Sequence, residues 1–274
     1  MTKFKDLSGK SPSPFGNNPG IGGLHAMTIQ QQEEDEDYIE EKLNNLNEKI
    51  KIDLTKFRDK EIEKLVSALI SKKKSNALLV GDAGVGKTQI VESLAYKIEN
   101  NDPLIPDTLK DYTVYELPIV NLVAGNGVVG SLEEDVKNII EFAKNEKVIL
   151  FIDEIHQILS KNDSVNNKIA QILKPELARG EIKVIAATTT QESRAIENDP
   201  AFKRRFQKIL INELTKNQTL EVLKTARNDM MSFYENKITI TDKDLNWFLK
   251  YSEEYKDSNS HRPDSALTLM DRTC

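Results

Sequence analysis

The sequence Gly81-Asp82-Ala83-Gly84-Val85-Gly86-Lys87-Thr88 decides the fold. It matches the pattern G-x-x-x-x-G-K-[S/T], in which a glycine-rich turn brings backbone N–H groups up to phosphate oxygens. The apolar run Ala77–Val80 precedes the motif, and the helical pattern Thr88–Glu99 follows it. A strand, this turn and then a helix form the context that such a motif requires. We therefore predict a phosphate-binding loop.

The residue types in the loop follow from the chemistry of phosphate binding. Glycines permit backbone conformations that a Cβ atom would disfavour, and the following helix N-terminus adds positive potential. Lys87 would reach the β- and γ-phosphates as a point charge, and the Thr88 hydroxyl would ligate Mg²⁺. The predicted nucleotide-binding residues are Gly81, Asp82, Ala83, Gly84, Val85, Gly86, Lys87 and Thr88.

A second motif supplies carboxylates. The continuous apolar run Val148–Ile152 predicts a strand buried on both faces, and Asp153 and Glu154 follow it directly. Ligands of open α/β folds bind at the carboxyl ends of such strands. We predict that Asp153 holds Mg²⁺ together with Thr88 and that Glu154 polarises the water that attacks the γ-phosphate of ATP.

The order of apolar segments predicts an α/β fold with a parallel sheet flanked by helices, because strands alternate with helices over residues 53–212. The predicted strands are Ala77–Val80, Val114–Val120, Val148–Ile152 and Val184–Ala187, and the predicted helices include Asp59–Ile70, Thr88–Glu99, Leu132–Asn145 and Ile169–Ala178, the last interrupted by Pro175. Residues 213–274 predict a small helical domain with helices at Thr215–Phe233, Asp242–Tyr255 and Pro263–Asp271.

Residues 1–52 differ from the rest. Gly, Pro, Ser and Asn crowd Gly9–Gly23, and seven acidic residues lie between Glu33 and Glu41. Such a composition predicts a solvated, acidic tail. Leu43, Leu46 and Ile50 have helical spacing, but we place the start of the folded core near Asp53.

Composition excludes several classes of function. The 274 residues include 38 basic and 44 acidic ones, a formal charge of −6, which argues against nucleic-acid binding by bulk charge. One cysteine, Cys274, excludes an internal disulfide, and with only three histidines beside it the composition argues against a Cys/His zinc site. No apolar run is long enough to span a membrane, and none follows the N-terminus as a signal segment, so we expect a cytoplasmic protein.

Several segments occur in an order that resembles the first ATPase module of the Clp-type AAA+ unfoldases ClpA, ClpB and ClpC. The similarity runs from Asp53 to Asp271, about four-fifths of the chain. The segments that carry it are residues 76–81, 148–156, 173–180, 187–189 and 204–208.

The resemblance implies a hexameric ring with ATP bound between neighbouring subunits and with Mg²⁺ as cofactor. It implies that Arg204 and Arg205 are arginine fingers that reach into the neighbour's site. Thr189 matches the sensor that places water at the γ-phosphate, with Thr188 as the alternative. Arg262 resembles the lid arginine of many AAA+ modules, and His156 matches a family histidine for which we favour a structural role.

The sequence also departs from the family. Lys56 and Phe57 replace small and apolar residues in the adenine-side segment Asp53–Asp59. In the loop Gly125–Gly130, Val128 stands where the family has a substrate-gripping aromatic residue. Valine offers much less contact area than an aromatic ring. A flexible loop without substrate contact is therefore an alternative interpretation.

Three functions remain open from the sequence. The first is a single-ring motor that uses ATP to remodel or unfold protein substrates, which the tail recruits directly or through an adaptor. The second is an AAA+ factor acting on nucleic-acid complexes, for which Lys72–Lys74 and Lys203–Arg205 offer local positive charge. The third is a nucleotide-gated scaffold that hydrolyses ATP slowly. We favour the first.

Overall fold

The structure is a computed structural model that describes residues 42–51, 53, 55–72, 74–124, 129–159, 164–235, 237–255 and 260–274. The side chains of residues 123–131 and 164–166 are outside this description. The predicted acidic tail, as far as residue 41, and Val128 therefore lie outside the described residues.

Within the described residues, a six-stranded sheet has the order β1-β3-β4-β5-β2-β6. Four of the five strand pairings are parallel, and β1 pairs with β3 in the antiparallel direction. The α/β prediction is confirmed, with an antiparallel edge added. The strands are β1 (Asn44–Asn45), β2 (Asn76–Val80), β3 (Thr113–Glu116), β4 (Val148–Ile152), β5 (Lys183–Thr188) and β6 (Phe206–Leu210).

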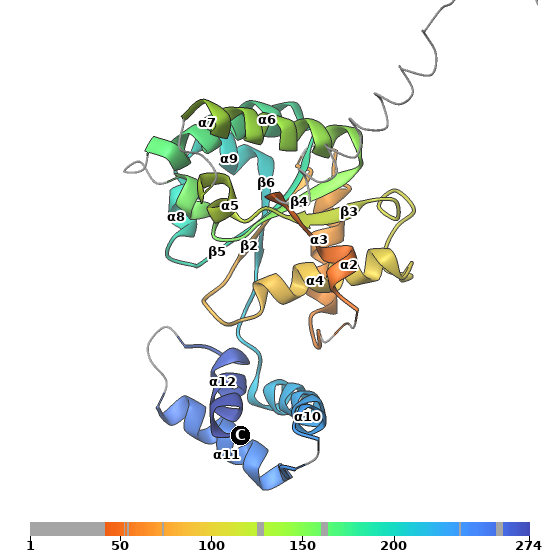
Figure 1. Ribbon diagram of the computed structural model, residues 1–274, viewed down its shortest axis with the longest axis vertical. Helices are drawn as coiled ribbons and strands as arrows, with labels where there is room; N and C mark the ends of the chain where they lie inside the picture. The colour runs from red at the N-terminus through yellow and green to blue at the C-terminus, as the bar shows by residue number, and fades with distance from the viewer. Residues whose placement is uncertain are drawn as a thin grey trace, which may run out of the picture. The chain divides into compact units, whose positions relative to one another are not determined.

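Helices cover both faces of this sheet (Figure 1). Figure 1 shows α3 and α4 on one face and α6, α7 and α9 on the other. These helices are α3 (Asp59–Leu69), α4 (Lys87–Glu99), α6 (Val129–Asn145), α7 (Ser164–Arg179) and α9 (Pro200–Arg205). Shorter elements are α2 (Leu46–Lys49), α5 (Ile119–Ala124), the 3₁₀ helix η1 (Ile155–Leu159) and α8 (Ser193–Glu197).

Double coverage explains the apolar runs of the central strands. Every residue of β2 and of β4 is buried. Because β2, β4 and β5 are parallel, their carboxyl ends meet at one edge of the sheet. The loop at residues 81–86, the Asp153–Glu154 pair and Thr189 follow these three strand ends. The topology thus gathers the predicted site residues of the three segments.

The C-terminal helices have a core of their own. Leu223, Leu245, Phe248, Ala266 and Met270 are buried in one cluster. The helices are α10 (Lys216–Phe233), α11 (Asp242–Glu254) and α12 (Asp264–Thr273), close to their predicted bounds. Capping boxes begin α10 at Thr215 and α11 at Thr241. The exact domain boundary at 212/213 stays a prediction. None of the described helices is both long and apolar enough to cross a membrane.

Packed structure begins before Asp53, the residue near which we placed the start of the core. Leu43 and Leu46 are buried, and β1 adds to the sheet through Asn44 and Asn45. Two residues of strand give no periodic signal, so only their pairing with β3 reveals them. The tail predicted for residues 1–52 is therefore too long at its C-terminal end.

Three further expectations need correction. The predicted strand Val114–Val120 ends at Glu116, and α5 begins at Ile119, because Pro118 cannot continue a strand ladder. Helix α7 runs through Pro175 to Arg179, held by the buried side chains of Leu173 and Leu177 on either side of the proline. Strand β6 was missed because it is an edge strand with exposed positions, so it lacks a continuous apolar run.

Candidate functional site

The glycine-rich loop has the conformation that its sequence predicts. Gly84 and Gly86 have φ angles of 79° and 91°, in a region that side chains disfavour. Lys87 begins α4, and its buried ammonium group donates hydrogen bonds to the carbonyl oxygens of Gly81 at 2.9 Å and Asp82 at 3.1 Å. The lysine therefore lies folded back over its own loop, within reach of a phosphate group there.

Thr88 and Asp153, the two predicted Mg²⁺ ligands, lie side by side. Thr88 Oγ1 donates to Asp153 Oδ2 at 2.8 Å, although 65 residues separate them. The other oxygen, Asp153 Oδ1, accepts from the Glu154 backbone N–H at 2.8 Å, which fixes the carboxylate. A hydroxyl and a carboxylate oxygen side by side are hard donors of the kind that Mg²⁺ prefers. The donor set fits this ion.

Glu154 occupies an unusual backbone conformation, with a φ angle of 49°. Burial raises the pKa of its carboxyl group, and the neighbouring Asp153 raises it further, whereas His156 and Lys87 oppose the shift. Glu154 Oε2 lies 3.2 Å from His156 Nδ1. Its side chain is 41% exposed, so it can also meet a solvent molecule.

The end of β5 approaches the same place. Thr188 is fully buried, with its Oγ1 3.3 Å from His156 Nδ1, whereas Thr189 is only partly buried. Thr189 Oγ1 donates to Glu192 Oε2 at 2.6 Å. Of the two threonines, Thr189 is the more accessible to a ligand.

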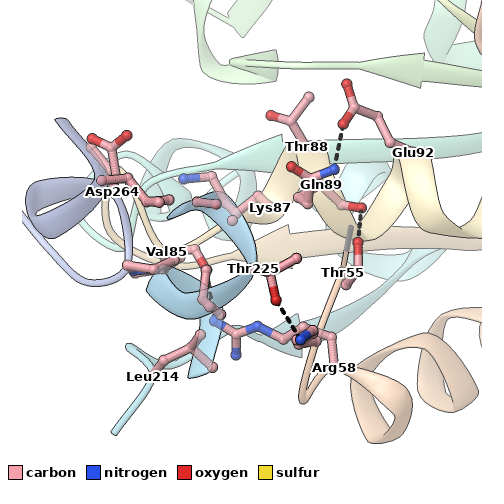
Figure 2. Close-up of a pocket in the computed structure, with 18 of the residues that line it drawn as sticks. Thr55, Arg58, Val85, Lys87, Thr88, Gln89, Glu92, Leu214, Thr225 and Asp264 are labelled. Atoms are coloured by element: carbon pink, nitrogen blue, oxygen red, sulfur yellow. Dashed lines mark hydrogen bonds between the residues drawn. The ribbon is translucent and has the colours of Figure 1, made fainter. Parts of the chain in front are cut away.

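A cavity of about 510 Å³ lies between the glycine-rich loop and the Asp153–Glu154 pair, and Thr189 is not among its lining residues (Figure 2). Its lining includes Lys87, Thr88, Asp153 and Glu154. Figure 2 shows that residues from before the loop and from the C-terminal helices surround the same space. The sequence motifs did not predict a ligand-binding role for the lining residues Thr55, Arg58, Gln89, Glu92, Leu214, Val222, Thr225, Ala226, Asp229, Pro263, Asp264 and Leu267.

Arg58 is the clearest of the missed residues. Its guanidinium is buried and donates to the carbonyl oxygen of Val85 at 2.6 Å, so it holds the glycine-rich loop in place. Burial lowers the pKa of Arg58, and Glu61 opposes this shift. The signal available in the sequence was its place within Asp53–Asp59, the segment that the family resemblance assigns to the adenine side.

Lys56, which lines the cavity, and Phe57, which does not, are the two residues at which the sequence departs from the family in this segment. Lys56 donates a hydrogen bond from its ammonium group to Thr225 Oγ1 of α10, so it links the segment before α3 to the C-terminal helices. Phe57 has a φ angle of 62° and is 42% exposed. This left-handed conformation is one that side chains disfavour.

Arg204 and Arg205 do not join the cavity. They end α9, which the buried Phe202 anchors, and Arg204 is exposed. Arg205 instead lines a second cavity together with Lys72 and Lys183. The structure therefore separates the arginine pair from the Lys87–Glu154 cluster of the same chain.

Arg262 forms ion pairs within the chain and does not line the cavity. Its guanidinium pairs with Glu213 at 2.9 Å and with Glu253 at 2.7 Å, and its side chain is 14% exposed. Its neighbours Pro263 and Asp264 line the cavity, but Arg262 does not. Through these ion pairs, Arg262 links the segment that precedes α10 to helix α11.

A parallel sheet, a glycine-rich loop opening a helix and an Asp-Glu pair at the adjacent strand end define the P-loop class of nucleotide-binding proteins. Residues 77–214, just over half of the chain, match the model of the "ATPase family associated with various cellular activities (AAA)". The chain belongs to this AAA family, and its relatives are of the Clp type.

The relatives agree with this assignment. The chain is 45% identical to the chaperone protein ClpB of Mycoplasmoides gallisepticum over 83% of its own length and 32% of the relative's. It is 36% identical to the Clp protease ATP-binding subunit ClpE of Bacillus subtilis over 89% of its own length and 35% of that protein's. The chain thus spans about a third of the curated relatives it matches.

The fold has solved counterparts. The Saccharomyces cerevisiae Hsp104:casein complex in its extended conformation superposes with a TM-score of 0.77 at 34% identity. The match covers 86% of this chain and 41% of that one. The S. cerevisiae Hsp104–ADP complex gives a TM-score of 0.76, also at 34% identity. These neighbours confirm the α/β AAA+ architecture.

Proposed function

We propose that this chain hydrolyses ATP and uses the energy to remodel or unfold protein substrates, as a Clp-type ring motor. The observation that carries the proposal is the 510 Å³ cavity in which Lys87, Thr88, Asp153 and Glu154 converge from two segments of the sequence. Similarity to chaperone proteins named ClpB supports a protein substrate over a nucleic acid.

The chemistry assigned to the site follows from its geometry. Backbone N–H groups of residues 81–86 and the start of α4 would hold the phosphates, with Lys87 beside the β- and γ-phosphates. Thr88 and Asp153 would hold Mg²⁺, which when bound neutralises phosphate charge. Glu154 would orient and polarise the attacking water, and Thr189 would help to place it.

The arginine pair supports an oligomeric site. Arg204 and Arg205 lie outside the cavity of their own chain but on an anchored helix. A ring, which we propose to be hexameric as the resemblance implies, would bring them to the γ-phosphate of a neighbour. Each site would then need residues from two chains.

Two further segments would handle the substrate. The acidic tail would recruit a protein substrate or an adaptor, and the loop with Val128 would contact the polypeptide. We expect these events to take place in the cytoplasm. One solved structural neighbour is the S. cerevisiae Hsp104:casein complex, which makes labelled casein a suitable first probe.

The test measures ATP hydrolysis together with the binding and unfolding of a protein substrate. Purified wild-type chain should hydrolyse ATP, bind fluorescent casein in the presence of a slowly hydrolysed ATP analogue, and unfold a tagged model protein only with ATP. The Glu154→Gln variant should retain casein binding and lose unfolding. Robust hydrolysis without any effect on proteins would contradict the remodelling function, and DNA-stimulated hydrolysis would favour the nucleic-acid alternative.

A further inference from the structure

Four polar side chains connect the end of β5 to the end of β4. Thr189 Oγ1 donates to Glu192 Oε2 at 2.6 Å, and the other Glu192 oxygen lies 3.1 Å from His156 Nε2. On the opposite edge of the ring, His156 Nδ1 lies 3.2 Å from Glu154 Oε2. A continuous path therefore joins Thr189 to Glu154, the two groups expected at the γ-phosphate end of the site.

We propose that His156 and Glu192 are positioning residues that hold the Glu154 carboxylate in register with Thr189 for attack on the γ-phosphate. The inference rests on the proposed ATP hydrolysis, because it assigns roles around the same reaction. It also revises the structural role that the sequence suggested for His156. Neither residue touches the nucleotide in this account; both act through Glu154 and Thr189.

Both residues are held firmly enough for this task. His156 lies in η1, whose Ile155 and Ile158 are buried, and the Gln157 N–H donates to the Glu154 carbonyl at 2.9 Å. The Glu192 backbone N–H donates to Thr189 Oγ1 at 3.3 Å, which closes a tight turn around that side chain. Groups that are fixed by their own backbone can orient a neighbour at low entropic cost.

Glu154 needs such support. Its side chain is 41% exposed and has several rotatable bonds, so an unrestrained carboxylate would sample many positions. A general base or water-orienting group works only within hydrogen-bond reach of the water, and a displacement of about 1 Å can cost about a hundredfold in rate. A ring nitrogen 3.2 Å away gives the carboxylate a partner that favours one of these positions.

A metal ion is the competing interpretation of these residues. Ligand atoms of Glu154, His156 and Glu192 all lie within 4.8 Å of one another. The two carboxylates, however, lie at different nitrogens of one ring. A single ion takes only one imidazole nitrogen, whereas here each ring nitrogen faces a different carboxylate, and Nδ1 also lies 3.3 Å from Thr188 Oγ1. The arrangement is therefore that of an oriented imidazole between two carboxylates.

The experiment separates positioning from folding by steady-state ATP hydrolysis. We expect His156→Ala to lower kcat about tenfold or more with KM for ATP changed less than about twofold, because only the orientation of Glu154 is lost. In His156→Asn, the amide nitrogen lies near the former Nδ1 and can still donate to Glu154. This variant should recover a measurable part of kcat, and His156→Gln, which extends toward Glu192, should recover less.

A double-mutant cycle tests the path as a unit. Glu192→Ala should also lower kcat, and His156→Ala/Glu192→Ala should be about as slow as the slower single variant, because both changes break one connection. Glu197→Ala is the matched control, since Glu197 is a nearby exposed carboxylate paired only with Lys208 in the described residues. It should leave kcat unchanged. Thermal unfolding of every variant measures the structural cost separately.

The outcomes are distinct. Variants of His156 and Glu192 that match the hydrolysing wild type in kcat, or that lose only thermal stability, would overturn this inference and leave the proposed function standing. Multiplicative losses in the double variant would also overturn it. If wild-type chain and Glu154→Gln were equally inactive while both bind ATP, the proposed function and this inference would fall together.

Discussion

The two halves of the proposed ATP site differ in how far one chain completes them. In the half formed by the loop and the strand ends, Lys87, Thr88 and Asp153 are already joined to their neighbours by hydrogen bonds. In the other half, Arg204 and Arg205 extend from α9, and among the described residues neither has an ion-pair partner. The difference teaches that one half is preorganised within the chain, whereas the proposed arginine half would be supplied by a second chain.

The largest effect is expected at Glu154, in the half of the site formed by the loop and the strand ends. Its replacement separates ATP binding from ATP turnover. Replacing Glu154 by Gln keeps the shape but removes the carboxylate that polarises water, so kcat should fall by about 10²–10⁴-fold. ATP affinity should stay within about twofold, because Thr88 and Asp153 are untouched. Hydrolysis assays with a parallel ATP-binding titration check this, and undiminished turnover would remove Glu154 from its role.

Lys87→Ala tests whether the loop is a phosphate cradle. The substitution removes the buried ammonium group that now contacts Gly81 and Asp82. ATP affinity should drop by about a hundredfold or more, since a desolvated charge pair with phosphate is lost. Lys208→Ala, an exposed lysine paired with Glu197, is the control. Equal ATP affinities of the two variants in equilibrium binding would contradict the assignment.

Through its ion pairs, Arg262 contacts neither the phosphate-loop half nor the arginine-pair half of the proposed site. Its removal should therefore affect stability more than ATP binding. Arg262→Ala leaves the carboxylates of Glu213 and Glu253 without their shared partner. We expect a loss of about 2 kcal/mol in the free energy of unfolding, measured with urea. A smaller change should follow Lys237→Ala, whose pair with Glu235 is exposed. Lost ATP affinity at unchanged stability would instead restore the lid-arginine role.

A pair of glycines gives the smallest and most local test. Gly84 and Gly180 have similar φ angles of 79° and 73°, but a Cβ at Gly84 would lie 2.8 Å from Cβ of Asp264, whereas a Cβ at Gly180 meets nothing within 4 Å. Both Ala variants should lose about 1 kcal/mol of stability from backbone strain, and Gly84→Ala should lose more because of its clash with Asp264. Only Gly84→Ala should also weaken ATP binding, by about tenfold. Equal ATP affinities would show that the contact with Asp264 does not matter.

Local patterns made half of this site predictable. The loop at 81–88 and the strand before Asp153 each carry their signal within a few residues, and parallel pairing then brings them together. The hydrogen bond between Thr88 and Asp153 follows from this topology. The same reasoning places Thr189 at the edge of the sheet where Glu154 lies.

Other contacts depend on side-chain geometry that no local pattern reports. The link from His156 to Glu192 spans 36 positions and requires a short 3₁₀ helix to face a turn after β5. The pairs of Arg262 with Glu213 and Glu253 likewise join distant segments. Strand β6 gives no continuous apolar run, because this edge strand has exposed positions such as Lys208.

Mixing two inactive variants tests the central claim most directly. Chains carrying Arg204→Ala/Arg205→Ala keep an intact loop, and chains carrying Lys87→Ala keep intact arginines. Each alone should hydrolyse ATP poorly. An equal mixture should recover about a quarter of wild-type activity, because in a randomly assembled ring one interface in four combines both intact halves. No recovery, in rings shown by mass to contain both chains, would contradict a site shared between subunits.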